Sequence, residues 1–246
     1  MDNVKASIKD YWNWRSVSYG HDEDKSIAIA DRWESIINEL AVGAPGRRAL
    51  DIGTGTGQLA VYLARAGFDV TGIDLAENMI SHAAQYAAGQ KLFIDFKAGD
   101  AEALDFGCDS FDAIVSRNLL WTLPKPHRAL REWRRVLKPG GTLIVSDGLW
   151  MNITWKRVYR LVFKLIKGNM RNGGRISLRF FLSYAGLQKS LPFYKGISIE
   201  KASMLLHDAD FREIRSYDTS TLDFNPYKNL RWNGKIPSFF IAYAKK

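Results

Sequence analysis

The sequence predicts an α/β fold in which helices cover a doubly wound, mostly parallel sheet. The first observation is an apolar segment, residues 49–52, which runs into three alternate glycines and then a helical stretch, residues 58–66. The second is another apolar segment, residues 69–74, which follows at once, so that a helix connects two strands. Units of this kind build parallel sheets and place ligands at the carboxyl ends of the strands.

The remaining elements continue this alternation along the chain. A helix over residues 26–40 leads through a Gly- and Pro-containing turn to the first strand, and an amphipathic helix over residues 126–137 ends at the Pro-Gly stop of residues 138–141. The further predicted strands cover residues 96–101, 111–118, 142–147, 211–217 and 238–245, and a late helix covers residues 199–209. Because the chain has 246 residues, 46% of them hydrophobic, and no visible repeat, we expect a single domain over residues 1–246.

The glycine turn after the first strand predicts a nucleoside site. Bare backbone at Gly53, Gly55 and Gly57 and the N-terminus of the following helix face one crevice, so a ligand can lie against the peptide. A dinucleotide fingerprint requires a glycine where this chain has Gln58, and Asp51 would repel a diphosphate. The Asp51 carboxylate could instead meet an ammonium group. Taken alone, these residues also fit a turn that serves only packing.

The run from Asp51 to Gly57 resembles motif I of the Rossmann-like, class I S-adenosylmethionine-dependent methyltransferases. Residues 117–123 and 135–141 are similar to the type 11, ubiquinone/menaquinone methyltransferase-like branch, and the likeness covers about residues 45–147. The resemblance implies S-adenosyl-L-methionine as the cofactor and S-adenosyl-L-homocysteine as its product. It also implies a seven-stranded sheet in the order 3-2-1-4-5-7-6 with the last strand antiparallel.

Acidic side chains at the ends of strands are the expected nucleoside contacts. Asp74 ends the second strand at a spacing suited to chelating two ribose hydroxyls, which is its role in the resembling family. The resemblance places Leu75 and Met79 against the adenine, Asp100 on its amino group and the backbone of Ala101 beside it. Met79 would equally serve as helix core, and an aspartate after a glycine is also a common turn residue.

Two further segments complete the expected cofactor site. The fourth strand ends in Ser116, Arg117 and Asn118, which are candidates for the methionine half of the cofactor and for the acceptor. A helical cap is expected over residues 1–42, and in the resembling family its aromatic segment folds over the bound cofactor. The expected cofactor contacts there are Tyr11, Trp14, Arg15 and Tyr19. The alternative is a hydrophobic helix that docks on the sheet.

A basic, aromatic segment, residues 149–198, is expected to form a helical lid inserted after the fifth strand. It holds ten Lys or Arg and no Asp or Glu, whereas the remainder has 25 basic and 26 acidic residues, so the net charge of +9 resides in the lid. At helical spacing its first half has a basic arc and an apolar arc. Three interpretations stay open: a helix packed on the core with a solvated basic face, an interfacial helix on anionic lipid, and a patch for an acidic substrate or nucleic acid. The expected acceptor contacts are Arg117, Trp121, Tyr159, Phe181 and Tyr184.

Catalysis does not require a dedicated base, because a sulfonium already makes its methyl group electrophilic. The enzyme then has to hold the acceptor in line and exclude water. Where the acceptor carries a proton, the candidates for its removal are His21, Asp22, His127, Tyr184 and His207, with His21 and Tyr184 preferred.

Composition narrows the class of protein. One cysteine, Cys108, and four scattered histidines predict no metal site and fit a reducing compartment. The fourth strand lacks the Asn/Asp-Pro-Pro-aromatic motif of nucleic-acid amino methyltransferases, and neither a signal peptide nor a membrane span is visible. We therefore expect a cytoplasmic methyltransferase acting on a small-molecule or lipid-like acceptor, with peripheral contact to anionic membrane and the oligomeric state left open. The alternative is a nonenzymatic nucleoside-fold protein that binds membrane or RNA through the basic lid.

Overall fold

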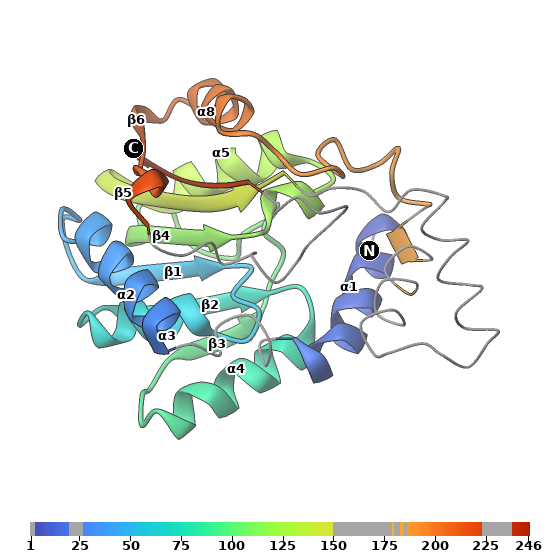
Figure 1. Cartoon of the computed structure of the whole chain (residues 1–246), viewed down its shortest axis with the longest axis horizontal. Helices are drawn as coiled ribbons and strands as arrows, with labels where there is room; N and C mark the ends of the chain where they lie inside the picture. The colour runs from blue at the N-terminus through green and yellow to red at the C-terminus, as the bar shows by residue number, and fades with distance from the viewer. Residues whose placement is uncertain (1–2, 20–26, 150–178, 180–182, 185, 223–237) are drawn as a thin grey trace.

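The structure is a computed structural model that describes residues 3–19, 27–149, 179, 183–184, 186–222 and 238–246. Its centre is a seven-stranded sheet in the order β3-β2-β1-β4-β5-β7-β6 (Figure 1). Neighbouring strands among β1 to β5 pair in parallel, and β7 is antiparallel to both β5 and β6. The predicted strand order and the antiparallel last strand are confirmed. The strands are β1 (Arg48–Ile52), β2 (Asp69–Asp74), β3 (Asp95–Ala98), β4 (Phe111–Arg117), β5 (Leu137–Gly148), β6 (Arg212–Ser216) and β7 (Phe239–Lys245).

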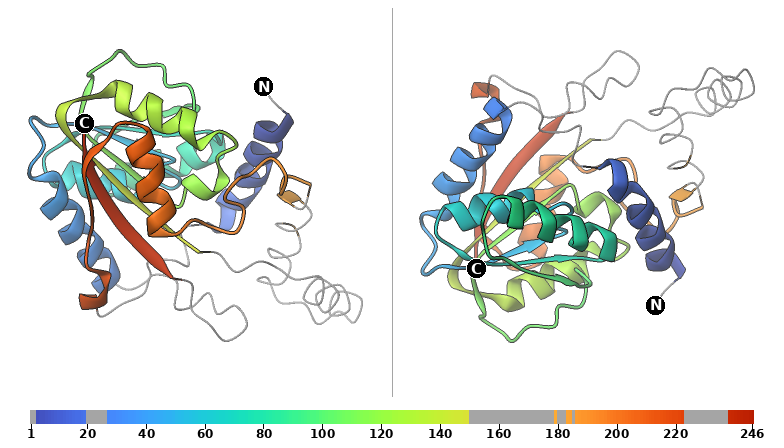
Figure 2. Two further views of the ribbon diagram at one scale, coloured as in Figure 1. Left: turned by 90° about the horizontal axis from the view of Figure 1, so that it is seen from above. Right: turned by 90° about the horizontal axis from the view of Figure 1, so that it is seen from below.

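Helices cover both faces of this sheet, as a doubly wound fold requires (Figure 2). Alternate residues of a strand point to opposite faces, so Leu50 and Ile52 of β1 pack on the side of α5 and α8, whereas Ala49 packs on the side of α2 and α3. Within the described residues, no helix is both long and apolar enough to cross a bilayer. The helices and short 3-10 turns are α1 (Asn3–Arg15), η1 (Ser16–Ser18), α2 (Ile27–Ala41), α3 (Gln58–Arg65), α4 (Glu77–Gly89), η2 (Leu120–Thr122), α5 (Pro126–Val136), α8 (Ile199–Asp208) and η3 (Thr219–Thr221).

The junction of α5 and β5 differs from the sequence-based expectation. The helix ends at Val136, and the strand begins directly at Leu137 instead of at residue 142. Leu137 pairs with Phe111, and the register then shifts before regular pairing with β4 resumes at residue 142. The Pro-Gly segment therefore stops the helix as predicted but forms an irregularity inside the strand.

α1 stands across the carboxyl ends of the parallel strands (Figure 1). A small core joins it to the end of the predicted lid, because Ile8 and Tyr11 pack with Tyr184, Leu187 and other buried side chains there. The second helix of the predicted cap behaves differently, since α2 buries its apolar side chains against the sheet. The basic helical stretch expected over residues 155–167 lies outside the described residues.

Candidate active site

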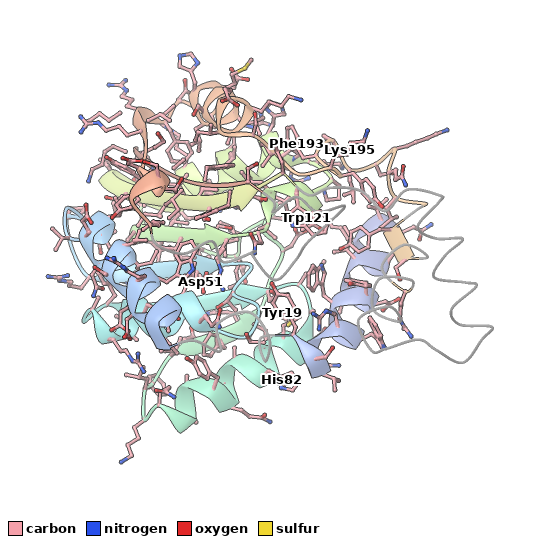
Figure 3. The ribbon with its side chains drawn as sticks, viewed as in Figure 1. Tyr19, Asp51, His82, Trp121, Phe193 and Lys195 are labelled. Atoms are coloured by element: carbon pink, nitrogen blue, oxygen red, sulfur yellow. The ribbon has the colours of Figure 1, made fainter. Side chains whose placement is uncertain are left out.

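A pocket lies at the carboxyl ends of β1, β2 and β4, between these strands and α1. Its empty volume is about 740 Å³, part of which is open to solvent. The glycine turn, the segments that follow β2, β3 and β4, and α1 together with Tyr19 line it. Figure 3 shows Tyr19 and Trp121 on the side of the sheet that faces α1, and Asp51 within the strands.

The three glycines of the turn have left-handed backbones, with φ of +70° at Gly53, +54° at Gly55 and +86° at Gly57. Gly53 and Gly55 line the pocket, as the predicted nucleoside wall requires. Gly57 lies away from it, where a Cβ would stand 3.0 Å from Cβ of Ala83 and 3.1 Å from Cζ of Phe96. The third glycine therefore allows α3 and α4 to approach closely, and the structure places it in packing and not among the pocket residues.

Asp51 stabilises the glycine turn from the side of α3. Its side chain belongs to the face covered by α3, is 1% exposed and does not line the pocket. One oxygen, Oδ2, accepts hydrogen bonds from the Thr54 hydroxyl at 2.6 Å and from the Ala60 N–H at 3.0 Å. Burial raises the pKa of Asp51 to about 6, against the hydrogen bond from Thr54. The structure thus brings Asp51 to the turn itself and not into contact with the pocket.

Asp74 lines the pocket at the end of β2. Its Oδ2 accepts the Gly55 N–H at 3.0 Å, and its Oδ1 accepts the Ala76 N–H at 2.9 Å. Burial raises the pKa of Asp74 to about 6, although backbone hydrogen bonds from Ala76, Gly55 and Leu75 oppose this shift. A carboxylate has about four acceptor positions, so Asp74 keeps acceptor capacity beyond these backbone contacts. The backbone thus fixes the orientation of a carboxylate that lines the pocket.

The loop after β3 forms the next part of the pocket wall. Asp100 and Ala101 line the pocket together with Leu75 and Met79. Oδ1 of Asp100 accepts the backbone N–H of Glu102 at 2.9 Å, which is the turn that sequence alone also allowed. Met79 is 1% exposed, so it belongs to the packed interior and to the pocket lining at the same time. The turn role of Asp100 and the core role of Met79 are therefore both compatible with a place in the pocket wall.

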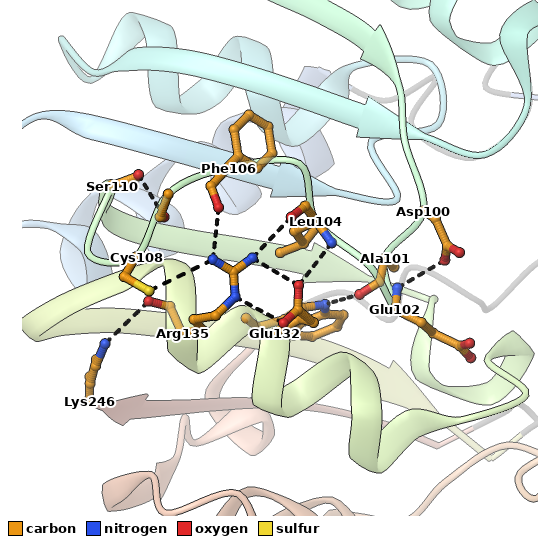
Figure 4. A network of polar contacts seen from close by, with 12 residues as sticks. Asp100, Ala101, Glu102, Leu104, Phe106, Cys108, Ser110, Glu132, Arg135 and Lys246 are labelled. Atoms are coloured by element: carbon orange, nitrogen blue, oxygen red, sulfur yellow. Dashed lines mark hydrogen bonds and ion pairs between the residues drawn. The ribbon is translucent and has the colours of Figure 1, made fainter.

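α5 anchors this loop through polar contacts (Figure 4). Trp133 Nε1 donates to the Ala101 carbonyl at 2.9 Å, and the Arg135 guanidinium donates to the carbonyls of Leu104 and Phe106 at 2.9 and 2.8 Å. Arg135 also pairs with Glu132 at 2.9 Å. Sequence reasoning missed this support, because the contacts join residues about thirty positions apart.

The end of β4 contributes two of the three predicted residues. Arg117 and Asn118 line the pocket, whereas Ser116 is buried and donates to the Ile52 carbonyl at 2.9 Å. The Arg117 guanidinium donates to Oε1 of Gln58 and lies 5.1 Å from the centroid of the Trp33 ring. Arg117 is thereby held at the glycine-turn side of the pocket.

α1 presents a different face to the pocket from the one predicted. Lys5, Ile8 and Trp12 line it, and they form one stripe at i, i+3 and i+7. Tyr19 also lines it, as predicted, and its ring lies 5.3 Å from that of Trp12. That stripe is visible in the sequence, but aromatic side chains occur on both sides of the helix, so periodicity could not decide which face turns inward.

The other three predicted residues of this segment, Tyr11, Trp14 and Arg15, are not among the residues that line the pocket. Tyr11 packs edge-on against Tyr184 at 5.1 Å between ring centroids, and the Arg179 guanidinium lies 4.4 Å from the centroid of a Trp14 ring. Arg15 donates to the Ser18 hydroxyl at 2.6 Å and stands over the Tyr19 ring. These contacts hold the N-terminal segment together beside the pocket.

Tyr184 and Trp121 lie just behind the pocket wall. Tyr184 is fully buried, and its hydroxyl is 3.1 Å from Oγ1 of Thr122, which does line the pocket. Burial raises the pKa of Tyr184 above its ordinary value, so the phenol stays protonated at neutral pH, which disfavours a role as a base. Trp121 is buried against the Tyr184 ring.

The remaining candidates are distributed elsewhere. His127 is exposed near the start of α5 and the His207 side chain is 84% exposed on α8, and neither lines the pocket. Four further candidates lie outside the described residues: His21, Asp22, Tyr159 and Phe181.

The pocket combines features that suit a nucleoside. Asp74 presents a carboxylate oriented by backbone N–H groups, Asp100 presents a second carboxylate, and Leu75 and Met79 supply apolar lining in the same pocket. Gly55 leaves the pocket wall beside Asp74 without a side chain. A Cβ at this position would have one neighbouring atom within 4 Å, Cε1 of Tyr19 at 3.6 Å.

Comparison with known proteins finds similarity to methyltransferases. The family profile described as "Methyltransferase domain" matches residues 50–145, which contain the glycine turn, Asp74 and Asp100. Over these residues the chain is similar to a class I methyltransferase domain of the type 11 branch. The chain is 38% identical over 122 residues to a demethylmenaquinone methyltransferase of Renibacterium salmoninarum, covering 50% of each chain. It is 36% identical over 108 residues to a ubiquinone biosynthesis O-methyltransferase of Coxiella burnetii, covering 44% of this chain and 46% of that one. The chain thus spans about half the length of the curated relatives it matches.

The likeness to solved structures extends beyond residues 50–145. A structure of the cyclase SpnF superposes with a TM-score of 0.62 and 22% identity, covering 99% of this chain and 94% of that one. A SAM-dependent methyltransferase from Aquifex aeolicus superposes with a TM-score of 0.59 and 21% identity, covering 90% and 93%. At these identities the likeness shows the fold, and the chemistry has to be argued from the site.

Proposed function

We propose that this protein transfers a methyl group from S-adenosyl-L-methionine to a small-molecule or lipid-like acceptor. The observation that carries the proposal is Asp74, whose two oxygens are oriented by backbone N–H groups and which lines the pocket beside the glycine turn. Asp100, Leu75 and Met79 line the adjoining pocket wall, where an adenine would follow the ribose.

The residues at the other end of the pocket suit the methionine half of the cofactor. Arg117 offers a cation to a carboxylate group, and Asn118 offers an amide beside it. S-adenosylmethionine, when bound, supplies a methyl group on a positively charged sulfur. The protein's own task is then to hold the acceptor in line with that methyl and to exclude water.

The wall around the expected acceptor position is mostly apolar. Ile8 and Trp12 of α1 face the segment that follows β4, where Leu119, Leu123 and Pro124 also line the pocket. Such a wall favours an apolar, ring-bearing or lipid-like acceptor, in keeping with the quinone-pathway names of the relatives. Where the acceptor carries a proton, we propose His21, which follows the pocket-lining Tyr19 in the sequence, as the group that removes it.

Titration calorimetry with S-adenosylmethionine and S-adenosylhomocysteine tests the cofactor assignment. Asp74→Asn keeps the shape but loses the charge, so affinity for S-adenosylhomocysteine should fall by about 1–3 kcal/mol, or about five- to 150-fold. Asp69→Asn is the matched control, because Asp69 is exposed at the opposite end of the same strand. A wild-type protein that binds neither compound would refute the proposal, and an unchanged affinity of Asp74→Asn would refute the ribose assignment.

We also propose that the basic lid, residues 149–198, brings the protein to anionic membrane surfaces where lipid-like acceptors reside. The ten basic residues of the lid, without any acidic residue, support this proposal. Co-sedimentation with vesicles containing phosphatidylglycerol should exceed that with neutral vesicles. Charge reversal at Lys156, Arg160 and Lys164 should abolish the difference, and binding that persists in this variant would contradict the proposal.

A further inference from the structure

Lys5 connects α1 to the loop that carries Asp100. Its Nζ lies 2.7 Å from Oδ2 of Asp100 and 2.6 Å from Oε2 of Glu102. The Lys5 side chain is 14% exposed, and that of Glu102 is 1% exposed. The other oxygen of Glu102 accepts the backbone N–H of Lys125 at 2.6 Å. A lysine of the N-terminal helix thus stands between two carboxylates at one end of the pocket.

The charge balance of this cluster depends on the ammonium group. A buried carboxylate is strongly unfavourable unless a cation or several hydrogen bonds accompany it. Burial alone would lower the pKa of Lys5, but its hydrogen bonds to Asp100 and Glu102 outweigh this effect and raise the pKa. Lys5 therefore stays charged and is a cation that both acids share.

Two other polar contacts of α1 lie farther out. Lys9 pairs with Glu77, whose side chain is 54% exposed, and Oδ1 of Asn13 accepts the Asn78 N–H at 2.9 Å. These contacts attach α1 to the first turn of α4. Exposed ion pairs such as that of Lys9 contribute little to stability, so Lys9 is a natural control for Lys5 on the same helix.

We propose that Lys5 is a positioning residue that couples docking of α1 over the pocket to the orientation of Asp100. The Glu102 N–H holds one oxygen of Asp100 and Lys5 holds the other, so the carboxylate is restrained from both sides. Its remaining acceptor positions are then available to an amino group in the pocket. If α1 moves away, the ammonium leaves with it, and two neighbouring carboxylates lose the cation between them.

This proposal rests on the proposed function for its ligand, S-adenosylhomocysteine, and a double-mutant cycle tests it. Lys5→Met should weaken binding of S-adenosylhomocysteine about tenfold, but less than about threefold when Asp100 is already Asn, because contacting residues couple in such cycles. Lys9→Met should bind within about twofold of the wild type. Equal losses from Lys5→Met in both backgrounds would overturn the proposal.

A second measurement needs no ligand and allows for the burial of Glu102. Lys5→Met alone leaves that carboxylate without its cation, so the comparison is made in a Glu102→Gln background, which removes the charge. Amide hydrogen exchange at residues 100–103 should be faster in the Lys5→Met/Glu102→Gln protein than in Glu102→Gln. In the control variant Lys9→Met, exchange at these residues should equal that of the wild type. Equal exchange in the first two proteins would overturn the coupling of α1 to Asp100, even if the wild type binds S-adenosylhomocysteine. Failure of the wild type to bind would refute the proposed function instead.

Discussion

Gly57 can be tested as a packing residue by replacing it with alanine. It precedes α3 with φ of +86°, and a Cβ there would lie 3.0 Å from Cβ of Ala83, 3.1 Å from Cζ of Phe96 and 3.2 Å from Cα of Ala83. Gly67, just beyond the other end of the same helix, has φ of +82° and no atom within 4 Å of its Cβ position. The two glycines share a backbone conformation and differ in their surroundings.

The expected magnitudes follow from this difference. Gly67→Ala should lower the free energy of unfolding by about 1–2 kcal/mol, the cost of a left-handed backbone for an L-residue. Gly57→Ala should incur the same cost and a further 1–3 kcal/mol or so from overpacking between α3, α4 and β3. The difference between the two variants therefore isolates the contact with Ala83 and Phe96.

Urea unfolding of the ligand-free protein, followed by circular dichroism, measures both variants under the same conditions. Gly55→Ala is a useful third variant, because its Cβ would meet only Tyr19, at an ordinary 3.6 Å. It should resemble Gly67→Ala in stability while weakening ligand binding. If Gly57→Ala and Gly67→Ala unfold at the same urea concentration, the packing role assigned to Gly57 is wrong.

Two further predictions concern protonation. Because burial raises the pKa of Asp74 to about 6 and its ionised form accepts the ribose hydroxyls, affinity for S-adenosylhomocysteine should hold above that pH and fall by up to about tenfold per pH unit below it. Calorimetry from pH 5 to 8, a range that includes the pKa of Asp74, measures this affinity. In Asp74→Asn the affinity should no longer depend on pH in this way. A wild-type affinity that does not change with pH would contradict the prediction. Tyr184→Phe removes the hydroxyl beside Oγ1 of Thr122, which should lower the unfolding free energy by about 1 kcal/mol and leave the pH dependence of turnover unchanged. If turnover of the wild type rises with pH and this rise is lost in that variant, Tyr184 would instead be restored as a base.

The sequence sufficed for the sheet and for the residues at its carboxyl edge. Local signals define them, because an apolar strand, a glycine turn and an acid after the next strand all lie within one short stretch. Topology then brings strand ends to one edge, which is why Asp74, Asp100 and Asn118 line the same pocket.

The parts that the sequence did not determine depend on which way a side chain faces. Asp51 lies on the α3 side of β1 and binds the turn, although its place in the motif suggested a ligand. On α1, Trp12 faces the pocket and Tyr11 faces Tyr184, and both are aromatic. Lys5 escaped notice because its acidic partners are about a hundred positions away in the sequence.

The way in which acidic side chains hold the glycine turn has a consequence for the thermodynamics of binding. Asp51 ties the turn to α3, and Asp74 ties it to the end of β2, before any ligand arrives. The conformational entropy of this stretch is therefore lost during folding and not during association. A ligand meets a rigid surface on that side, so the ordering that accompanies binding is confined to other walls of the pocket, among them α1.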